Sequence, residues 1–184
     1  MVRSIQFLLL VVCATLVARA SSAAEFETLS GVKGFYVSSV QSFGTPKSGK
    51  TDPLALQRAE DKASLEMTKV VQGELKKAGI RVFTQEEFRD QADVPSLQVT
   101  ETTIFDEFGT RHTALRLEVH QLVAIYVNRQ NALATTWSRD RLAVIGKDVA
   151  NQVPGSVAIV NGMLEELISD YRRANPQAAA SPQD

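Results

Sequence analysis

The sequence has one cysteine and two histidines among its 184 residues, which limits its metal and redox chemistry. Cys13 lies in an apolar run that we expect to be removed, so the mature chain would have neither a disulfide nor a thiolate metal site. Val12 precedes Cys13 where lipoprotein processing needs Gly or Ala, which argues against lipidation. His112 and His120 would be separated by about 27 Å along a strand at ~3.4 Å per residue, too far to bind one metal ion.

Catalytic patterns are also missing from the sequence. No Gly-x-Ser-x-Gly motif occurs, so the nucleophile turn of the α/β-hydrolases is excluded. The acidic pairs at 86–87, 106–107 and 165–166 are sequence neighbours whose side chains point in different directions, so none forms a two-carboxylate site. We therefore predict no catalytic residue, no metal and no cofactor, and an enzyme is the less favoured class.

The first 23 residues have the order of a secretory signal peptide. A positive start that includes Arg3 precedes an apolar run over 5–18. The segments Ala18-Arg19-Ala20 and Ser21-Ser22-Ala23 then offer small residues at the −3 and −1 positions that a signal peptidase needs. A membrane-spanning helix needs about 20 apolar residues, and this run is shorter. We expect residues 1–23 to be cleaved and the mature chain to be periplasmic or secreted, without stable membrane insertion. An uncleaved anchor is the alternative.

Length and charge describe the rest of the chain. Cleavage after Ala23 would leave 161 residues with a net charge of −3, because two basic residues leave with the signal. This length suits one buried core, so we assign residues 24–176 to a single domain. Residues 177–184, rich in Ala, Pro and Gln, are predicted to form a disordered tail. A weakly acidic chain gives no reason to expect a nucleic-acid partner.

Hydrophobic spacing and local signals predict an α+β fold in the order β-α-β-(α)-β-β-β-α. Asp52 and Pro53 should begin a long helix that Gly79 ends. Thr84 and Glu87 have capping-box spacing and should open a short helix. We expect a mostly antiparallel mixed sheet with two long helices packed on one face. Strands are predicted at 32–43, 80–83, 97–104, 115–127 and 133–144.

The end of the chain should form the second long helix. A break at Pro154–Gly155 precedes a helical apolar stripe, so Ser156 is expected to cap this helix and Asn175–Pro176 to end it. Trp137, near the middle of the last predicted strand, is expected to anchor the core.

The predicted strand over 115–127 gives a candidate interaction surface. Its apolar residues alternate with Arg116, Glu118 and His120, which occupy the other face. Such a row is typical of cross-strand surface pairs rather than a catalytic set. We expect this face to be wet at its start and more covered toward its end.

Residues 44–51, GTPKSGKT, match the phosphate-loop pattern G-x-x-x-x-G-K-[ST]. Gly49, Lys50 and Thr51 are the candidate cofactor-binding residues, with Lys50 reaching phosphates and Thr51 holding magnesium. Pro53 disfavours this interpretation, because it lacks the N–H that the first helical turn of a true phosphate loop uses. Export would also take the loop away from cytosolic nucleotides. An ordinary loop is the expected structure.

Four segments carry a family resemblance: the helix exit LKKAGIRV at 75–82, the strand over 115–127, the Thr136–Trp137 return strand and the closing helix over 157–171. Their order resembles the small α/β domain at the amino end of the TolB translocation protein and in the curli-secretion CsgG-like group. The resemblance implies an interaction or assembly role in the cell envelope and carries over no site residue. The chain differs from the secretion lipoproteins because it has no lipidated cysteine.

Two functional hypotheses follow from these patterns. The first is an exported, non-catalytic binding or assembly module of the cell envelope, whose partner is an envelope protein or a second copy joined through an edge strand. The alternative is an enzyme, either a nucleotide-binding hydrolase that uses the loop over 44–51 or an unrecognised hydrolase around His120. Nucleotide binding by the mature chain, with and without Lys50→Ala, distinguishes the two.

Overall fold

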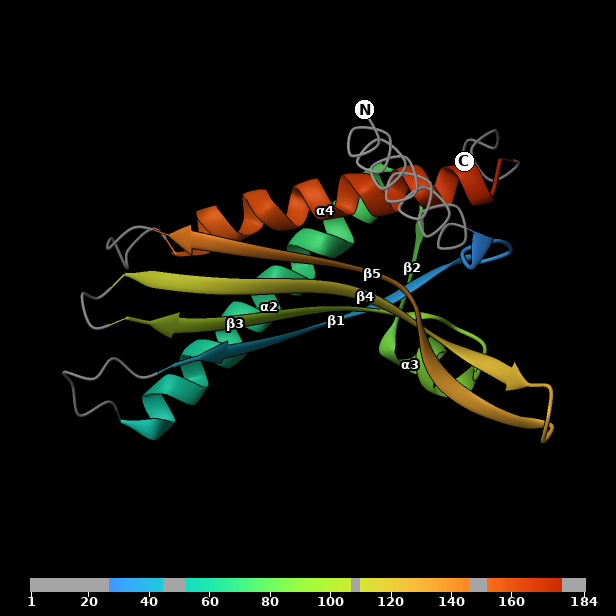
Figure 1. Ribbon diagram of the computed structural model, residues 1–184, viewed down its shortest axis with the longest axis horizontal. Coiled ribbons are helices and arrows are strands. Elements are labelled where there is room, and N and C mark those ends of the chain that lie inside the picture. Colours follow the sequence, from blue (N-terminus) through green and yellow to red (C-terminus); the bar gives the residue numbers. More distant parts are fainter. Residues whose placement is uncertain (1–26, 45–51, 107–109, 146–151, 177–184) are drawn as a thin grey trace, which may run out of the picture.

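The structure, a computed structural model, describes residues 27–44, 52–106, 110–145 and 152–176. These residues form a five-stranded sheet in the order β2-β1-β3-β4-β5, together with helices α2, α3 and α4 (Figure 1). Strand β1 pairs in parallel with β2 and β3, whereas β3, β4 and β5 are antiparallel. The predicted α+β fold is confirmed. The elements are β1 (Gly34–Phe43), α2 (Pro53–Lys77), β2 (Arg81–Phe83), α3 (Gln85–Asp90), β3 (Ser96–Phe105), β4 (Arg111–Ile125), β5 (Gln130–Ile145) and α4 (Gln152–Ala174).

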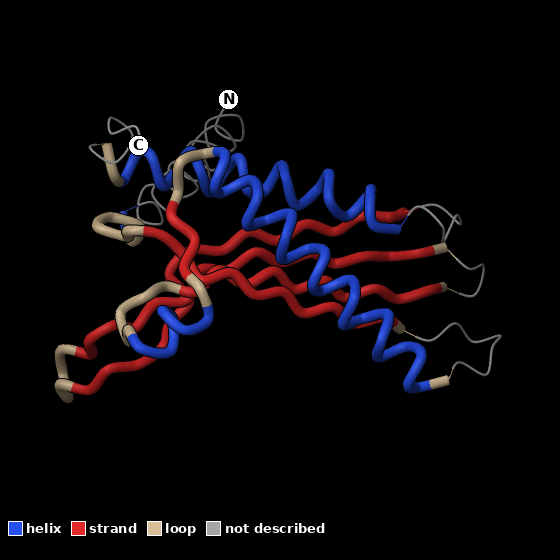
Figure 2. The backbone as a smooth tube through the Cα atoms, turned by 180° about the vertical axis from the view of Figure 1, so that it is seen from behind, coloured by secondary structure: helices blue, strands red, loops and turns tan. Residues whose placement is uncertain are grey.

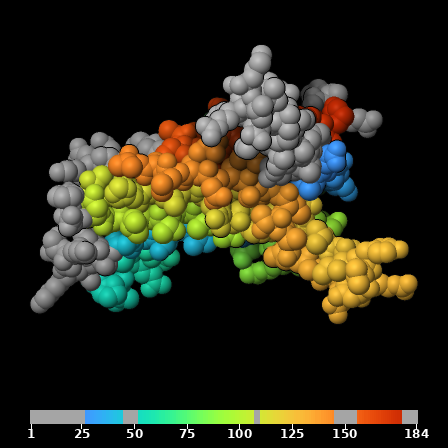
Figure 3. Space-filling view, viewed as in Figure 1, coloured from blue at the N-terminus to red at the C-terminus, as the bar shows by residue number. Residues whose placement is uncertain are grey.

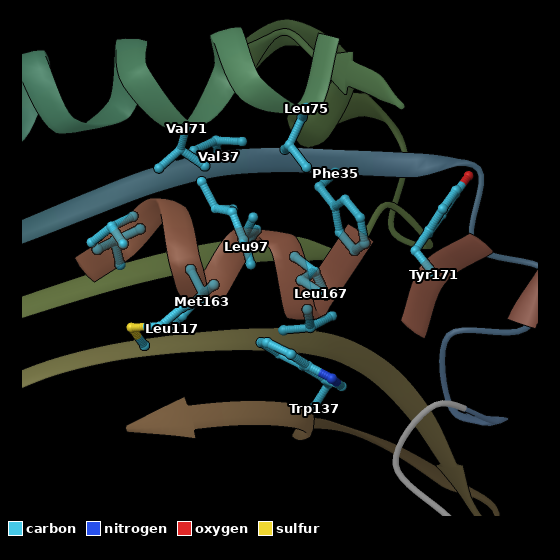
Figure 4. Close-up of a cluster of buried hydrophobic side chains, with 14 of the residues drawn as sticks. Phe35, Val37, Val71, Leu75, Leu97, Leu117, Trp137, Met163, Leu167 and Tyr171 are labelled. Carbon is cyan, nitrogen blue, oxygen red and sulfur yellow. The ribbon is translucent and has the colours of Figure 1, made fainter. Parts of the chain in front are cut away.

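The long helices α2 and α4 cover one face of the sheet (Figure 2). The core lies between them and the strands, and its side chains include Phe35, Leu97, Leu117, Leu75 and Leu167, each fully buried (Figure 4). Apolar burial of this kind contributes about 25 cal/mol per Å² and is the main term that holds the layers together.

Trp137 anchors the core, as predicted. Its side chain is 1% exposed, and its indole Nε1 donates to Oδ2 of Asp170 on α4 at 3.1 Å. A buried indole N–H needs an acceptor, and this bond supplies one while joining β5 to α4.

The predicted ends of α2 are confirmed. The carboxylate of Asp52 accepts from the backbone N–H of Leu54 at 3.0 Å, and Pro53 occupies the first helical position. At the other end, Gly79 has a φ of +76°, and the N–H of Ile80 donates to the carbonyl of Leu75 at 2.9 Å. This left-handed closure satisfies the last carbonyls and sends the chain into β2.

The short helix α3 begins with the predicted capping box. The hydroxyl of Thr84 accepts from the N–H of Glu87, whose carboxylate in turn accepts from the N–H of Thr84 at 2.7 Å. Phe88 then stacks on Tyr36 of β1 at 4.4 Å between ring centroids. This contact places α3 beside the sheet face that α2 and α4 leave open.

Helix α4 differs from its prediction at its start. It begins at Gln152, so the expected break at Pro154–Gly155 is wrong and Ser156 is not its N-cap. Ser156 lies inside the helix, 1% exposed, and its hydroxyl donates to Oε1 of Glu101 at 2.7 Å. The predicted end is close, since Asn175 follows the helix and its Nδ2 donates to the carbonyl of Tyr171 at 3.0 Å.

Strands β4 and β5 are longer than predicted, and a β-bulge between Val119 and His120 interrupts their register. A bulge bends and twists the ribbon that carries it. Beyond this bulge the two strands turn away from α4 and project from the body of the molecule (Figure 1). Strand β4 ends at Ile125 rather than at the predicted Val127.

Candidate functional site

The sequence-predicted surface residues Arg116, Glu118 and His120 lie on the open face of the sheet. Arg116 Nε donates to Oδ1 of Asp140 on β5 at 2.6 Å, so the expected cross-strand pairing occurs. This contact raises the pKa of Arg116 above its usual value. The His120 ring approaches Glu118 at 3.9 Å and lies 3.2 Å from the hydroxyl of Thr135. The row forms ion pairs and hydrogen bonds along the strands rather than converging on one point.

A shallow hollow on this face brings two of the three predicted residues together. Arg116 and Glu118 line it with Asp140, and His120 is not among its lining residues. Both charged side chains of the Arg116–Asp140 pair are more than half exposed, so water screens the pair and its contribution to stability is small. The side chains of His120 and Glu118 are less exposed, at 18% and 19%.

The candidate phosphate-loop residues Gly49, Lys50 and Thr51 lie outside the described residues. The residues that flank them are described. The N–H of Gly44 donates to the carbonyl of Thr103 on β3 at 2.6 Å, and the carboxylate of Asp52 accepts from the N–H of Leu54. The first glycine of the motif and the first N–H of α2 therefore donate to protein acceptors.

The projecting end of the β4–β5 ribbon, residues 121–134, forms what we call the hairpin arm. At its tip Tyr126 is 97% exposed and Val127 is 93% exposed. Leu122, Ile125 and Leu133 are also exposed along its length. The prediction that this face becomes more covered toward its end is therefore wrong, because beyond the bulge the ribbon projects from the body of the molecule. Figure 3 shows the arm standing out from the body.

The hairpin arm has an ordered backbone. Its strands pair from Gln121–Ala134 to Ile125–Gln130, and the N–H of Arg129, at φ +56°, donates to the carbonyl of Ile125 at 2.9 Å. At its base, Nε2 of Gln121 donates to the carbonyl of Thr28 at 3.0 Å. A preformed arm loses less conformational entropy when it binds a partner.

A second group of polar residues is buried under α2 and α4 at the end of the sheet away from the arm. Arg111 and Glu101 form an ion pair at 3.3 Å with side chains only 3% and 5% exposed. Burial lowers the pKa of Arg111, and the charge of Glu101 partly opposes this effect. The group also contains Gln41, Thr103, Thr113 and Ser156.

Residue type alone does not reveal this buried polar group, although the alternation of the strands places its members on the core side. Glu101 and Thr103 continue the alternation of Leu97 and Val99 on β3, and Arg111 and Thr113 continue that of Leu115 and Leu117 on β4. The period of two places them on the core side. Only their polarity suggested exposure.

Two further structural findings limit the chemistry of the described residues. Within 27–44, 52–106, 110–145 and 152–176, no three His, Cys, Asp or Glu side chains gather to hold a metal ion. Among the same residues, no helix combines the length and the apolar character needed to cross a membrane.

Comparison with known family models and with curated proteins finds no match. The resemblance to the TolB and CsgG-like domains therefore stays a prediction.

Proposed function

We propose that the protein is an exported, non-catalytic binding or assembly module of the cell envelope that holds a protein partner through its hairpin arm. The observation that carries this proposal is the exposure of Tyr126 and Val127 at the tip of an ordered, projecting ribbon. Folded chains rarely leave large apolar side chains grouped in water unless another surface covers them.

The chemistry of the hairpin arm favours a protein partner. Arg129 is the only charged residue over 121–134, so the arm offers little attraction to phosphates or anionic headgroups. Tyrosine is enriched at protein interfaces because its ring buries a large area while its hydroxyl can still form a hydrogen bond. An apolar pocket with a polar rim on the partner would accept this tip.

The edge of the sheet extends the proposed surface. Strand β5 has β4 as its one neighbour within the part of the chain that the structure describes. An edge strand presents unpaired N–H and C=O groups that an extended partner segment can use. The arm would supply apolar anchors, and the adjoining edge would supply backbone hydrogen bonds.

The alternative, a nucleotide hydrolase, receives less support. The described flanks of the loop over 44–51 already use the Gly44 N–H and the first free N–H of α2 within the protein. Among the described residues, no three His, Cys, Asp or Glu side chains gather where they could hold a metal ion.

Photo-crosslinking in intact cells tests the proposal. A photoreactive amino acid at position 126 should give one discrete adduct with an envelope protein in the periplasmic fraction. Leu65 on α2, also exposed and apolar, is the matched control position and should give no such adduct. Edman sequencing of the same fraction should find a mature chain that begins at Ala24.

The outcomes separate the possible occupants of the arm. An adduct of twice the mass of the chain would indicate self-association in place of a separate partner. Equal yields at positions 126 and 65, or crosslinks to lipid alone, would contradict the proposal. So would recovery of the uncleaved chain from the cytosol.

A further inference from the structure

A cavity of about 220 Å³ lies between the first half of α2 and the end of the sheet remote from the hairpin arm. Its walls are largely apolar and come from Phe43, Ala59, Ala63 and Met67. Lys62 and Glu66 of α2, whose charged groups lie 4.0 Å apart, also line it. A cavity near 150 Å³ is enough to hold benzene in an engineered protein, so this space has room for a small molecule.

The floor of the cavity is polar and fixed. The carboxylate of Glu101 accepts from Nη2 of Arg111 at 3.3 Å and from the hydroxyl of Ser156 at 2.7 Å. Arg111 Nε also donates to the hydroxyl of Thr113 at 3.1 Å. Because the cation and the anion are paired with each other, the floor has no net charge and does not call for an ion as a ligand.

Gln41 supplies a feature that points to a ligand. Its side chain lines the cavity and is 6% exposed, and its Nε2 lies 3.3 Å from the hydroxyl of Ser39. Its Oε1 is buried and accepts no hydrogen bond from the described residues. A buried carbonyl oxygen without a donor is costly, and a ligand that donates to it recovers that cost.

We propose that this cavity binds a small, uncharged, mainly apolar molecule with one hydroxyl or N–H group, which donates to Oε1 of Gln41. The apolar body packs against Ala63 and Met67. The charged groups that line the cavity are paired, Arg111 with Glu101 and Lys62 with Glu66, which favours an uncharged ligand. This site is separate from the hairpin arm, so its failure would leave the proposed protein-binding function untouched.

A pair of isosteric probes tests the site. Phenol and toluene have the same size and differ in one hydroxyl donor, and each is titrated into the mature protein while the Met67 methyl signal is followed by NMR. We expect phenol to bind about tenfold more tightly than toluene, the difference expected for one satisfied buried acceptor. Equal affinities, or no saturable shift at Met67, would overturn the proposal.

Three variants test whether the preference for phenol arises at Gln41 and whether the probes occupy this cavity. Gln41→Leu removes the acceptor and should abolish the preference for phenol. Gln98→Leu, on the open face of β3, where Nε2 of Gln98 bonds to the Thr100 hydroxyl at 3.4 Å, is the matched control and should keep that preference. Ala63→Leu fills the cavity from α2 and should abolish binding of both probes without removing a polar group. Unchanged phenol binding in Ala63→Leu would refute the assignment even if Gln41→Leu fails to fold.

Discussion

Removing the cation of the buried Arg111–Glu101 pair should destabilise the fold strongly. In Arg111→Met the side chain stays long and apolar, but the carboxylate of Glu101 remains beneath α2 and α4 without its charge partner. The hydroxyls of Thr113 and Ser156 also lose the hydrogen bonds that they accept from the guanidinium. The variant therefore leaves several buried polar groups only partly satisfied.

The burial of this ion pair determines how much stability the variant should lose. Breaking a buried ion pair from one side costs about 3–5 kcal/mol. For a domain of this length, each kcal/mol lowers Tm by about 2–4 °C, so we expect a fall of roughly 6–20 °C. Arg116→Met is the matched control, because the Arg116–Asp140 pair is more than half exposed on both sides and should contribute at most about 1 kcal/mol.

Urea unfolding of both variants measures the difference. Adding Glu101→Gln to Arg111→Met removes the lone buried charge and should recover part of the lost stability. If Arg111→Met costs no more than Arg116→Met, the described burial of this pair is wrong.

Three other predictions follow from local geometry. Gly34→Ala places a Cβ 2.3 Å from the carbonyl oxygen of Arg81, so β2 should lose its pairing with β1, and unchanged amide exchange at 81–83 would contradict this. The pKa of Glu87 is lowered by its bond to the Thr84 backbone and by Arg81, so its stabilising effect is present above the unfolded pKa and is lost as pH falls through the folded value. An NMR titration should find a midpoint below 4.5, and Arg81→Gln should raise it; an unchanged midpoint would refute the assignment. Calorimetry should show no saturable ATP binding to the mature chain, and binding that Lys50→Ala abolishes would favour the hydrolase alternative.

The sequence predicts those parts of the fold that short-range rules control. Asp52–Pro53 and Gly79 define the ends of α2 because capping depends on a few neighbouring residues. The Thr84–Glu87 box and the burial of Trp137 follow from equally local signals.

The missed features depend on contacts between distant segments. Ser156 looks like a helix cap in the sequence, but Glu101, 55 residues away, accepts from its hydroxyl inside the packed helix. The bulge at Val119–His120 has no marker in the sequence, yet it directs the hairpin arm away from the helices. Arg111 and Glu101 suggested solvent exposure by residue type, and only their pairing across β3 and β4 makes burial possible.

The proposed role of the hairpin arm is to hold a protein partner at its tip. Its most direct test is the affinity of the purified partner, once crosslinked at position 126 and identified, for Tyr126→Asp and for Leu65→Asp. Tyr126→Asp removes a buried anchor and introduces a charge, which should cost about 2 kcal/mol or more of binding free energy and weaken binding about 30-fold. Leu65→Asp should bind with the wild-type affinity. Equal affinities for the two variants would contradict the claim.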